Sequence, residues 1–291
     1  MSLAPRAVLV HRRTAYADAV ARHGTPGAAD FFLRTRGGSL TELEEADEQQ
    51  RRALAAVAAA VPADWRTGSV ERADLSRFLF APEDVVVVVG QDGLVANVAK
   101  YLSGQVVVGI DPAPGRNAGV LVRHPASAAR ELLHRSTSGG ACEQRTMVCA
   151  STDDGQELHA LNEVFVGHRS HQTARYVLSA GDRHEEQASS GVVAGTGTGA
   201  TGWLASLARG RAGLPAPTDA SLAWFVREAW PSRTTGADLV AGTVATEPLT
   251  LDVLSDELVV FGDGLEDDRL TLSRGQRITV TVSPRRLALL R

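Results

Sequence analysis

Short apolar runs alternate with amphipathic segments over the first 125 residues of the chain. Residues 7–10, 85–89 and 106–110 are continuous apolar runs. The last two are rich in valine, which is typical of strands buried on both faces. Residues 41–61 read TELEEADEQQRRALAAVAAAV. Their acidic start and Ala/Leu/Arg body predict a helix, with Thr41 as its N-cap.

A segment with helical spacing joins the two valine runs. Residues 92–104, DGLVANVAKYLSG, predict a helix that Gly104 closes. When a strand, a helix and a strand follow one another, the two strands lie parallel and the crossover is right-handed. We therefore expect a parallel sheet in this part of the chain.

The pattern changes near residue 139. Short runs rich in Val, Thr and Leu, such as TMVCAS, ARYVLSAG and RITVTVS, recur between turn signals, which indicates antiparallel β-structure. Helical patterns interrupt it near GATGWLASLARG and ASLAWFVREAW. The predicted fold class is α/β, with an N-terminal Rossmann-like α/β domain (residues 1–130) and a C-terminal antiparallel β-rich domain (residues 131–291). The last strand can return to the N-terminal domain.

Composition narrows the classes of function. The 291 residues include 30 Lys and Arg against 34 Asp and Glu, for a net charge of −4, and no basic face for nucleic acid is marked. No apolar run approaches the roughly 18–20 residues that a membrane span needs. Cys142 and Cys149 form neither a disulfide framework nor a metal-ligand set, and Cys149 is interpreted as a packing residue. With no signal peptide, we expect a cytoplasmic protein without nucleic-acid or membrane partners.

The turn after the first valine run carries an acid. Gly90, Gln91, Asp92 and Gly93 follow the run directly, at the carboxyl edge of the expected sheet, where ligands of open α/β sheets bind. Glycines let a phosphate approach the backbone, and the next helix offers free N–H groups. The alternative is that Asp92 caps that helix. The spacing matches neither the dinucleotide fingerprint nor a phosphate loop ending in Gly-Lys-Ser/Thr.

Two stretches in the second half of the chain add to this picture. Asn162 and Glu163 are adjacent within the strand-like run HALNEVFVG, so at least one faces inward or the strand ends there. A buried glutamate needs a partner, which ligand hydroxyls could supply. Residues 189–207 pass from a strand through a TGTG loop into a helix, and such a loop exposes N–H groups and hydroxyls. An exposed Asn–Glu turn and a plain glycine-rich connection are the alternatives.

Taken in order, the three stretches resemble the NAD kinase family. That family carries GGDG after an N-terminal strand, an Asn–Glu pair in its β-domain and a Thr-rich TPTGSTAY-like loop. Here the corresponding segments are GQDG at 90–93, NE at 162–163 and TGTGATGW at 196–203. The opening HRRTAYADAVARHGT and the TGTG loop followed by Trp203 look most similar to the mitochondrial-type branch. GIDPAPGRNAGVL and the C-terminal FGDG segment extend the likeness over most of the chain.

The resemblance implies a two-domain kinase that transfers the γ-phosphoryl group of ATP to the 2′-hydroxyl of the adenosine ribose of NAD, with its site in the cleft between the domains. Asp92 would be catalytic and accept the proton of the attacking hydroxyl. The residues implied to bind the nucleotides are Gly90, Gln91, Gly93, Asn162, Glu163, Thr198, Gly199 and Thr201. Mg²⁺ would arrive with ATP, so no dedicated metal site is expected. Arg116 or His124 could supply positive charge, and the family likeness points to a homodimer.

Departures from the family pattern keep other functions open. Gln91 stands where the family has glycine, Leu94 where it has threonine, and Ala200 and Gly202 alter the Thr-rich loop. One alternative is a kinase of the same superfamily that acts on another alcohol. Another is a catalytically silent NAD- or nucleotide-binding protein. The choice between NAD and NADH, and the identity of the phosphoryl donor, also stay open.

Overall fold

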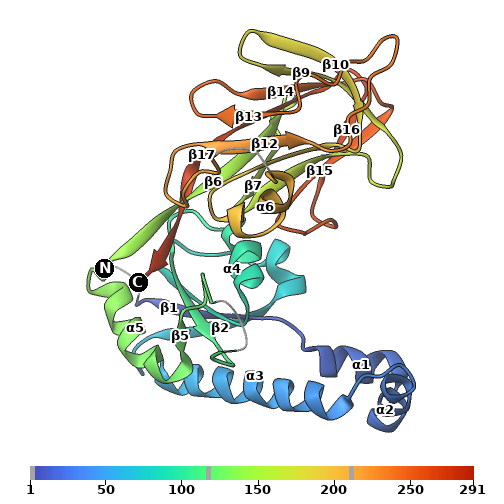
Figure 1. Cartoon of the computed structure of the whole chain (residues 1–291). Helices are drawn as coiled ribbons and strands as arrows, with labels where there is room; N and C mark the ends of the chain where they lie inside the picture. The colour runs from blue at the N-terminus through green and yellow to red at the C-terminus, as the bar shows by residue number, and fades with distance from the viewer. Residues whose placement is uncertain (1–3, 116–118, 210–212) are drawn as a thin grey trace. The chain divides into compact units, whose positions relative to one another are not determined.

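The computed structural model describes residues 4–115, 119–209 and 213–291. The chain divides into two compact units, coloured continuously along the sequence in Figure 1. Unit 1 contains the residues up to Val98, then Gln105–Cys142 and Ala288–Arg291. Unit 2 contains Ala99–Gly104 and Glu143–Leu287. Each unit has its own hydrophobic core, and each is described separately below.

Unit 1 is built on a parallel sheet. Its strands are β1 (Arg6–His11), β2 (Arg66–Glu71), β3 (Asp84–Val89) and β4 (Val106–Asp111). They lie in the order β4–β3–β1–β2, and every neighbouring pair is parallel. Every residue of β3 is buried. The prediction of a parallel strand–helix–strand unit, with strands covered on both faces, is therefore confirmed.

The outer edge of β4 is covered by two separate segments. The end of β17 (Arg277–Leu290) pairs with its first half, where Ala288 and Leu289 lie opposite Val106 and Val107. β5 (His124–Pro125) pairs with its second half. Residues that lie far apart in the sequence thus complete the sheet of unit 1.

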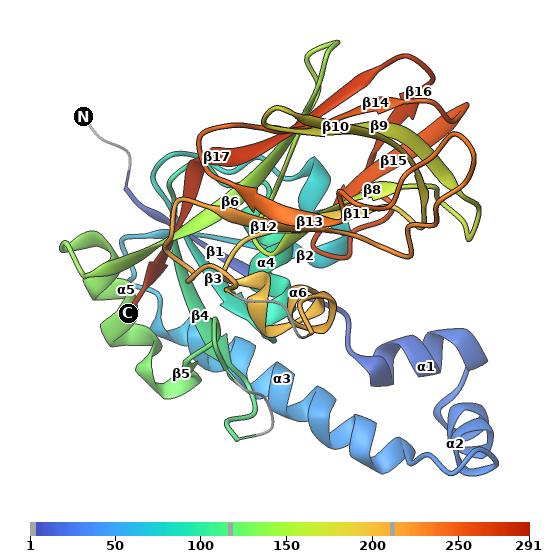
Figure 2. The ribbon, with the colours of Figure 1, turned by 45° about the horizontal axis from the view of Figure 1, so that its top comes forward.

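Helices cover the sheet of unit 1, as Figures 1 and 2 show. α3 (Leu40–Ala60) and α5 (Ala129–Thr137) share one core with β3 and β4. α1 (Ala15–His23) and α2 (Pro26–Arg34) precede α3, and α4 (Asp92–Ala99) joins β3 to β4.

The helix predicted over residues 41–61 is confirmed, but its cap was wrong. The helix begins one residue before Thr41, so Ser39 is the N-cap and its hydroxyl accepts the N–H of Glu42. α4 ends at Ala99, five residues before Gly104. Gly104 has a φ of 96°, in the left-handed region, but it lies in the connection after the helix and does not close it.

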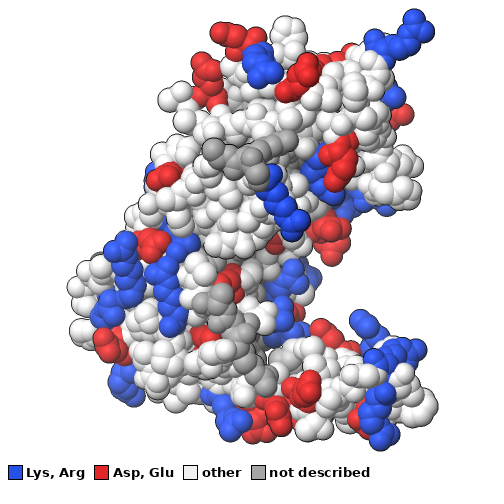
Figure 3. Space-filling view, viewed as in Figure 1, with Lys and Arg blue, Asp and Glu red and all other residues white. Residues whose placement is uncertain are grey.

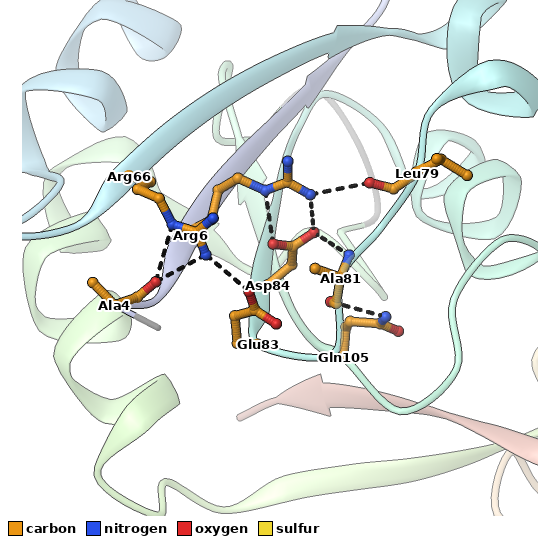
Figure 4. Close-up of polar contacts among 8 residues, drawn as sticks. All are labelled: Ala4, Arg6, Arg66, Leu79, Ala81, Glu83, Asp84 and Gln105. Atoms are coloured by element: carbon orange, nitrogen blue, oxygen red, sulfur yellow. Dashed lines mark hydrogen bonds and ion pairs between the residues drawn. The ribbon is translucent and has the colours of Figure 1, made fainter. Parts of the chain in front are cut away.

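Ion pairs fix the amino ends of the strands in unit 1 (Figure 4). Arg6 in β1 donates from Nε and Nη2 to the two carboxylate oxygens of Asp84, at 2.8 and 2.6 Å. Arg66 at the start of β2 donates to Glu83 at 2.8 Å. These ion pairs lie at the edge of the sheet opposite the Gly90–Gly93 turn, and their charges are paired with each other. They do not involve the residues at the carboxyl edge.

Unit 2 consists of two antiparallel sheets around one core. In the first sheet, β9 (Ala174–Ala180) lies between β10 (Arg183–Ser189) and β14 (Leu249–Val253). The next strand, β17, pairs with β14 and also with β6 (Cys142–Thr152). β6 in turn pairs with β7 (Glu157–Ala160). The second sheet has the order β13 (Ala241–Val244), β12 (Leu222–Val226), β11 (Val192–Gly195), β8 (Glu163–Gly167), β15 (Glu257–Gly262) and β16 (Leu270–Ser273). Apolar side chains of both sheets form a single cluster that includes Tyr176 and Trp224. The prediction of antiparallel β-structure is confirmed.

Of three predicted segments in unit 2, one differs from the structure. ASLAWFVREAW was expected to be helical, and this was wrong, because it forms β12, a strand paired on both sides. A short apolar run fits a buried strand or a buried helix equally well, and the partner strands decide. The run HALNEVFVG is broken at Leu161–Asn162 into β7 and β8. η3 (Gly199–Thr201) and α6 (Trp203–Leu207) confirm the short helical segment near GATGWLASLARG.

Charged residues of both signs occur on the face shown in Figure 3, and most of that face is uncharged. Within the described ranges, no helix combines the length and apolar character needed to cross a membrane.

Candidate functional site

A cavity of about 280 Å³ lies at the carboxyl ends of β1, β3 and β4 in unit 1. Its wall contains residues that follow these strands and residues of α3, namely Arg12, Thr14, Ala15, Leu43, Ala46, Gln49, Gln50, Gly90, Gln91, Pro112 and Ala113. Ligands of open α/β sheets bind at this edge. Two residues predicted to bind the nucleotide, Gly90 and Gln91, thus line a cavity.

Among the described residues, the cavity wall has the guanidinium of Arg12, three glutamine amides and no carboxylate. Gln50 donates from Nε2 to the carbonyl of Val89 at 2.8 Å, which fixes α3 against the end of β3. The side-chain oxygen of Gln49 is buried, and it has no hydrogen-bond partner within the described part of the chain. Buried polar atoms are normally paired, so this oxygen is placed to accept a bond from a ligand. With Arg12 at its rim, the cavity suits a polar or anionic ligand.

Asp92 begins α4, directly after the cavity residues Gly90 and Gln91. Its carboxylate accepts three backbone N–H groups. Oδ2 is 2.9 Å from the nitrogen of Val120, and Oδ1 is 2.8 and 2.9 Å from those of Leu121 and Val122. These bonds reach a different segment and do not cap the residue's own helix. A carboxylate has about four lone-pair positions, so one position on Oδ2 is still available.

The segment held by Asp92 passes unusually close to β4. A Cβ on Gly109 would lie 2.1 Å from the carbonyl oxygen of Leu121 and 2.9 Å from the Cα of Val122. Those are backbone atoms, so no side chain fits at this position. Glycine in β4 and the carboxylate of Asp92 together determine the course of residues 120–122. His124 follows in β5, and Arg116 lies outside the described residues.

In unit 2, Asn162 and Glu163 lie where β7 ends and β8 begins. Asp263 accepts the N–H groups of Leu161 and Asn162, each at 2.7 Å, from a turn where its own φ is 52°. Its carboxylate therefore fixes the backbone of the Asn–Glu pair. Within the described residues, neither the Asn162 amide nor the Glu163 carboxylate is hydrogen-bonded to the protein. Both are free to meet a ligand.

Burial raises the pKa values of both acids at this site. Burial, and to a smaller extent the charge of Asp263, raise the pKa of Glu163 to about 7. Burial also raises the pKa of Asp263 to about 6, while the backbone N–H bonds and Lys100 act in the opposite direction. Acids with raised pKa values gather at functional sites. Glu163 can therefore hold or release a proton near neutral pH.

The loop after β11 packs directly on the Asn–Glu pair. The N–H of Thr196 donates to the carbonyl of Asn162 at 2.8 Å, and its hydroxyl donates to the carbonyl of Leu161 at 2.6 Å. A Cβ on Gly199 would lie 2.7 Å from the carbonyl oxygen of Asn162 and 3.1 Å from Oε2 of Glu163. Glycine at 199 is thus required for this close packing. The structure brings Asn162, Glu163 and Gly199 together.

Two threonines of this loop are already bonded within the protein. Arg145, which is 2% exposed, donates from Nη1 to the hydroxyl of Thr198 at 3.3 Å. Arg145 also forms an ion pair with Glu143 at 2.9 Å. The hydroxyl of Thr201 donates to the carbonyl of Thr198 at 3.4 Å. The Thr198 hydroxyl keeps its own proton for a bond to a ligand.

The chain has the fold of a solved NAD kinase. That protein is the NAD kinase from Archaeoglobus fulgidus in complex with ATP, and the match spans 98% of this chain and 93% of that chain, with a TM-score of 0.57 and 15% sequence identity. No family model and no curated protein matches the sequence. The likeness establishes the fold and confirms the predicted class, an α/β part and an antiparallel β-rich part.

The predicted site residues fall into two groups within this fold. Gly90, Gln91, Asp92 and Gly93 belong to unit 1, and Asn162, Glu163, Thr198, Gly199 and Thr201 belong to unit 2. Within unit 1, a Cβ on Gly93 would meet no atom within 4 Å, so this residue has open space beside it.

Sequence reasoning missed several residues that shape the two groups. Asp263 lies in the GDG sequence 262–264, which shares its Asp-Gly with residues 92–93, and this likeness is a signal that could have indicated it. Gly109 lies in the GIDPAPGRNAGVL segment, but nothing in the sequence shows which backbone approaches it. Arg12 and Gln49 reach the cavity only through the folding of β1 and α3.

Proposed function

We propose that the chain transfers the γ-phosphoryl group of ATP to the 2′-hydroxyl of the adenosine ribose of NAD and so forms NADP. The observation that carries this proposal is the cavity at the carboxyl ends of β1, β3 and β4, whose wall includes Gly90 and Gln91 immediately before Asp92. The fold likeness to an NAD kinase and the ordered sequence motifs support it.

In this proposal Asp92 orients the attacking hydroxyl. Three backbone N–H groups fix its carboxylate, and one lone-pair position on Oδ2 can accept the hydrogen bond of the hydroxyl. As the hydroxyl oxygen bonds to the γ-phosphorus of ATP, the bond from that phosphorus to the β,γ-bridging oxygen breaks and ADP leaves. The hydroxyl proton passes to Oδ2 of Asp92. Phosphoryl transfer depends chiefly on position and charge, and a carboxylate fixed at three points positions well.

Residues of the cavity receive the phosphates. The guanidinium of Arg12 supplies positive charge, and the Gln91 amide supplies a donor where the family has only backbone. Gly93 leaves its backbone open to a phosphate because no atom crowds it. Gln49 offers its buried oxygen to a hydroxyl or amine of the nucleotide.

In unit 2, the Asn–Glu pair binds a ribose. The free amide of Asn162 and the carboxyl of Glu163 offer both donors and acceptors to its hydroxyls. Thr198, Gly199 and Thr201 line the adenine and ribose through backbone and hydroxyl groups. Asp263 acts through the pair, because it holds their backbone without needing to touch the ligand.

Mg²⁺ fits this site only as a partner of the nucleotide. No carboxylate lines the cavity in the part of the chain that the structure describes, and Asp92 has one lone-pair position left. A Mg²⁺ ion prefers oxygen ligands and usually keeps phosphates and waters around it. When bound, it would neutralise charge on the phosphates.

The test is direct assay of NADP formation. Purified protein with Mg²⁺, ATP and NAD should make NADP in proportion to time and enzyme, measured by an enzymatic cycling assay specific for NADP. Asp92→Asn is the matched control. Background rates with NAD and NADH, across ATP, other triphosphates and polyphosphate, would contradict the proposal. A mass-spectrometric screen of other alcohols would then test the alternative acceptor that the Gln91 side chain at the cavity makes plausible.

The assembly and the branch of the family are separate proposals. A homodimer rests on the family likeness alone and is tested by light scattering on a gel-filtration column, where a monomer mass at assay concentration would reject it. The mitochondrial-type branch rests on the likeness of the opening segment and of the TGTG loop followed by Trp203. The same NADP assay, run with NAD and with NADH, measures which of the two dinucleotides the chain prefers.

A further inference from the structure

Three side chains with metal-ligand chemistry lie together on one face of the β6–β7 hairpin in unit 2. Cys149 in β6 lies directly opposite His159 in β7. Glu157 precedes His159 by two residues, so it projects from the same face of the strand. The sulfur, the imidazole nitrogen and the carboxylate oxygen all lie within 4.8 Å of one another. None of these residues belongs to the proposed kinase site.

The hydroxyl of Ser283 orients the imidazole of His159. Its Nδ1 lies 3.0 Å from the hydroxyl oxygen of Ser283, which also accepts the N–H of Arg285 at 3.0 Å. An oxygen with two acceptor positions can take both bonds. When Nδ1 carries the proton and donates it to Ser283, the lone pair of Nε2 points into the cluster. A metal-binding histidine is held in this way by a second partner.

At the front of the imidazole, Nε2 faces the carboxylate of Glu157. Nε2 of His159 is buried and unbonded within the described residues, and Oε2 of Glu157 lies 3.4 Å away. With the proton on Nδ1, a lone pair faces a carboxylate across this gap. Two acceptors in contact repel each other, and a shared cation between them removes the repulsion. The third group at this gap is the sulfur of Cys149, which is 5% exposed.

We propose that Cys149, Glu157 and His159 bind a divalent transition-metal ion of the zinc class, with one sulfur, one oxygen and one nitrogen ligand. Zinc takes these three donor types and adopts four-coordinate geometry, so water fills the fourth position. On binding, the thiol of Cys149 releases its proton to solvent as the sulfur–metal bond forms. The imidazole contributes its Nε2 lone pair, and Glu157 its carboxylate.

The electrostatics of the three side chains agree with this exchange. Burial raises the pKa of the Cys149 thiol to about 11, so the free thiol is protonated and binding must release one proton. Burial lowers the pKa of His159, which keeps the imidazole neutral and able to coordinate. The charge of Glu157 raises both pKa values, and the positive charge of Arg285 lowers both. A bound ion would pin β7 two residues before Leu161, where the backbone of the Asn–Glu pair begins.

Cobalt spectroscopy tests the site without any use of enzyme activity. Protein stripped with a chelator is titrated with Co²⁺, and the expected result is one ion per chain with a sulfur-to-cobalt charge-transfer band and intense visible bands of a four-coordinate ion. Zn²⁺ should displace the cobalt. Cys149→Ser should lose the charge-transfer band. Cys142→Ser should keep it, and this is the matched control because the chain has two cysteines.

Zinc affinity, measured by competition with a coloured chelator, separates the ligands from their support. Ser283→Ala should weaken binding by roughly 10–100-fold, as the loss of an orienting partner does. Glu157→Gln alters a side chain that is 55% exposed, so it leaves the core intact and should also weaken binding at least about 10-fold. Absence of one-to-one binding, a cobalt band that survives in Cys149→Ser, or an unchanged affinity in Glu157→Gln would each overturn the proposal.

Discussion

Replacing Asp92 by asparagine should damage stability and catalysis together. The carboxylate accepts one N–H at Oδ2 and two at Oδ1, all from residues 120–122. In the asparagine variant one of these oxygens becomes an NH₂ group. The amide has the lower energy with its NH₂ group at the Oδ2 position, where the NH₂ faces one donor, the N–H of Val120. In the opposite orientation the NH₂ would face two donors, the N–H groups of Leu121 and Val122.

The size of the effect follows from the three bonds. Leaving the Val120 N–H unpaired costs about 1–3 kcal/mol. The other two bonds change from charge-assisted to neutral, which costs about 1 kcal/mol each. The expected loss is therefore about 3–5 kcal/mol of unfolding free energy, a fall in melting temperature on the order of 10 °C. If Asp92 also accepts the proton of the acceptor hydroxyl, kcat should fall by roughly 10²–10⁴-fold.

Urea unfolding and the NADP assay measure the two effects separately. Asp256→Asn is the control, because that side chain is 94% exposed and its change should cost less than about 0.5 kcal/mol. An Asp92→Asn protein as stable as the wild type would refute the role of the carboxylate in holding residues 120–122. Normal turnover by a folded variant would refute its catalytic role alone.

Three further predictions concern the surroundings of the two groups of site residues. Because the pKa of Glu163 is raised from 4.5 to about 7, its contribution to stability is complete below about pH 4.5 and is lost as the pH rises through about 7; Glu163→Gln should flatten this decline in urea unfolding measured against pH. Gly109→Ala should destabilise the protein by about 3 kcal/mol or more in thermal unfolding, because its Cβ meets backbone at 2.1 Å, whereas Gly93→Ala, with open space, should change stability by less than about 1 kcal/mol. Gln91→Gly should weaken nucleotide binding by about 1–3 kcal/mol in calorimetry if the amide bonds a phosphate; unchanged affinity and unchanged KM for both substrates would place the Gln91 side chain away from the ligand.

The sequence predicted those elements whose burial leaves a regular pattern of apolar residues. The valine runs identify β3 and β4, and the acidic, Ala-rich segment identifies α3, because burial on both faces or on one stripe leaves a periodic pattern. The Asn–Glu pair was recognised because polar residues interrupt an apolar run. β12 was missed because an apolar run of five residues carries no period of its own, and its partners β11 and β13 lie elsewhere in the chain.

Other features depend on contacts that no local pattern records. The partners of Asp92 are backbone N–H groups 28–30 residues away, so any sequence in that segment could supply them. Asp263 holds Leu161 and Asn162 across about 100 residues in the same way. Cys149 and His159 become neighbours only through the register of the β6–β7 hairpin. Carboxylates that accept distant backbone N–H groups, and residues that become neighbours across strands, can therefore be identified only from the three-dimensional structure.

The pairing of β17 with β4 has a consequence during translation. Ala288 and Leu289 cover the edge of β4 at Val106 and Val107, yet they are synthesised after the whole of the intervening segment, residues 143–287. At about 5–20 residues per second, the ribosome needs roughly 7–30 s to make that segment. Throughout this interval the edge of β4 lacks its native partner in the nascent chain, and an unpaired strand edge readily takes up a strand from another chain. Chaperone binding to the nascent protein is thus expected to concentrate on this edge and to end when residues 288–290 emerge.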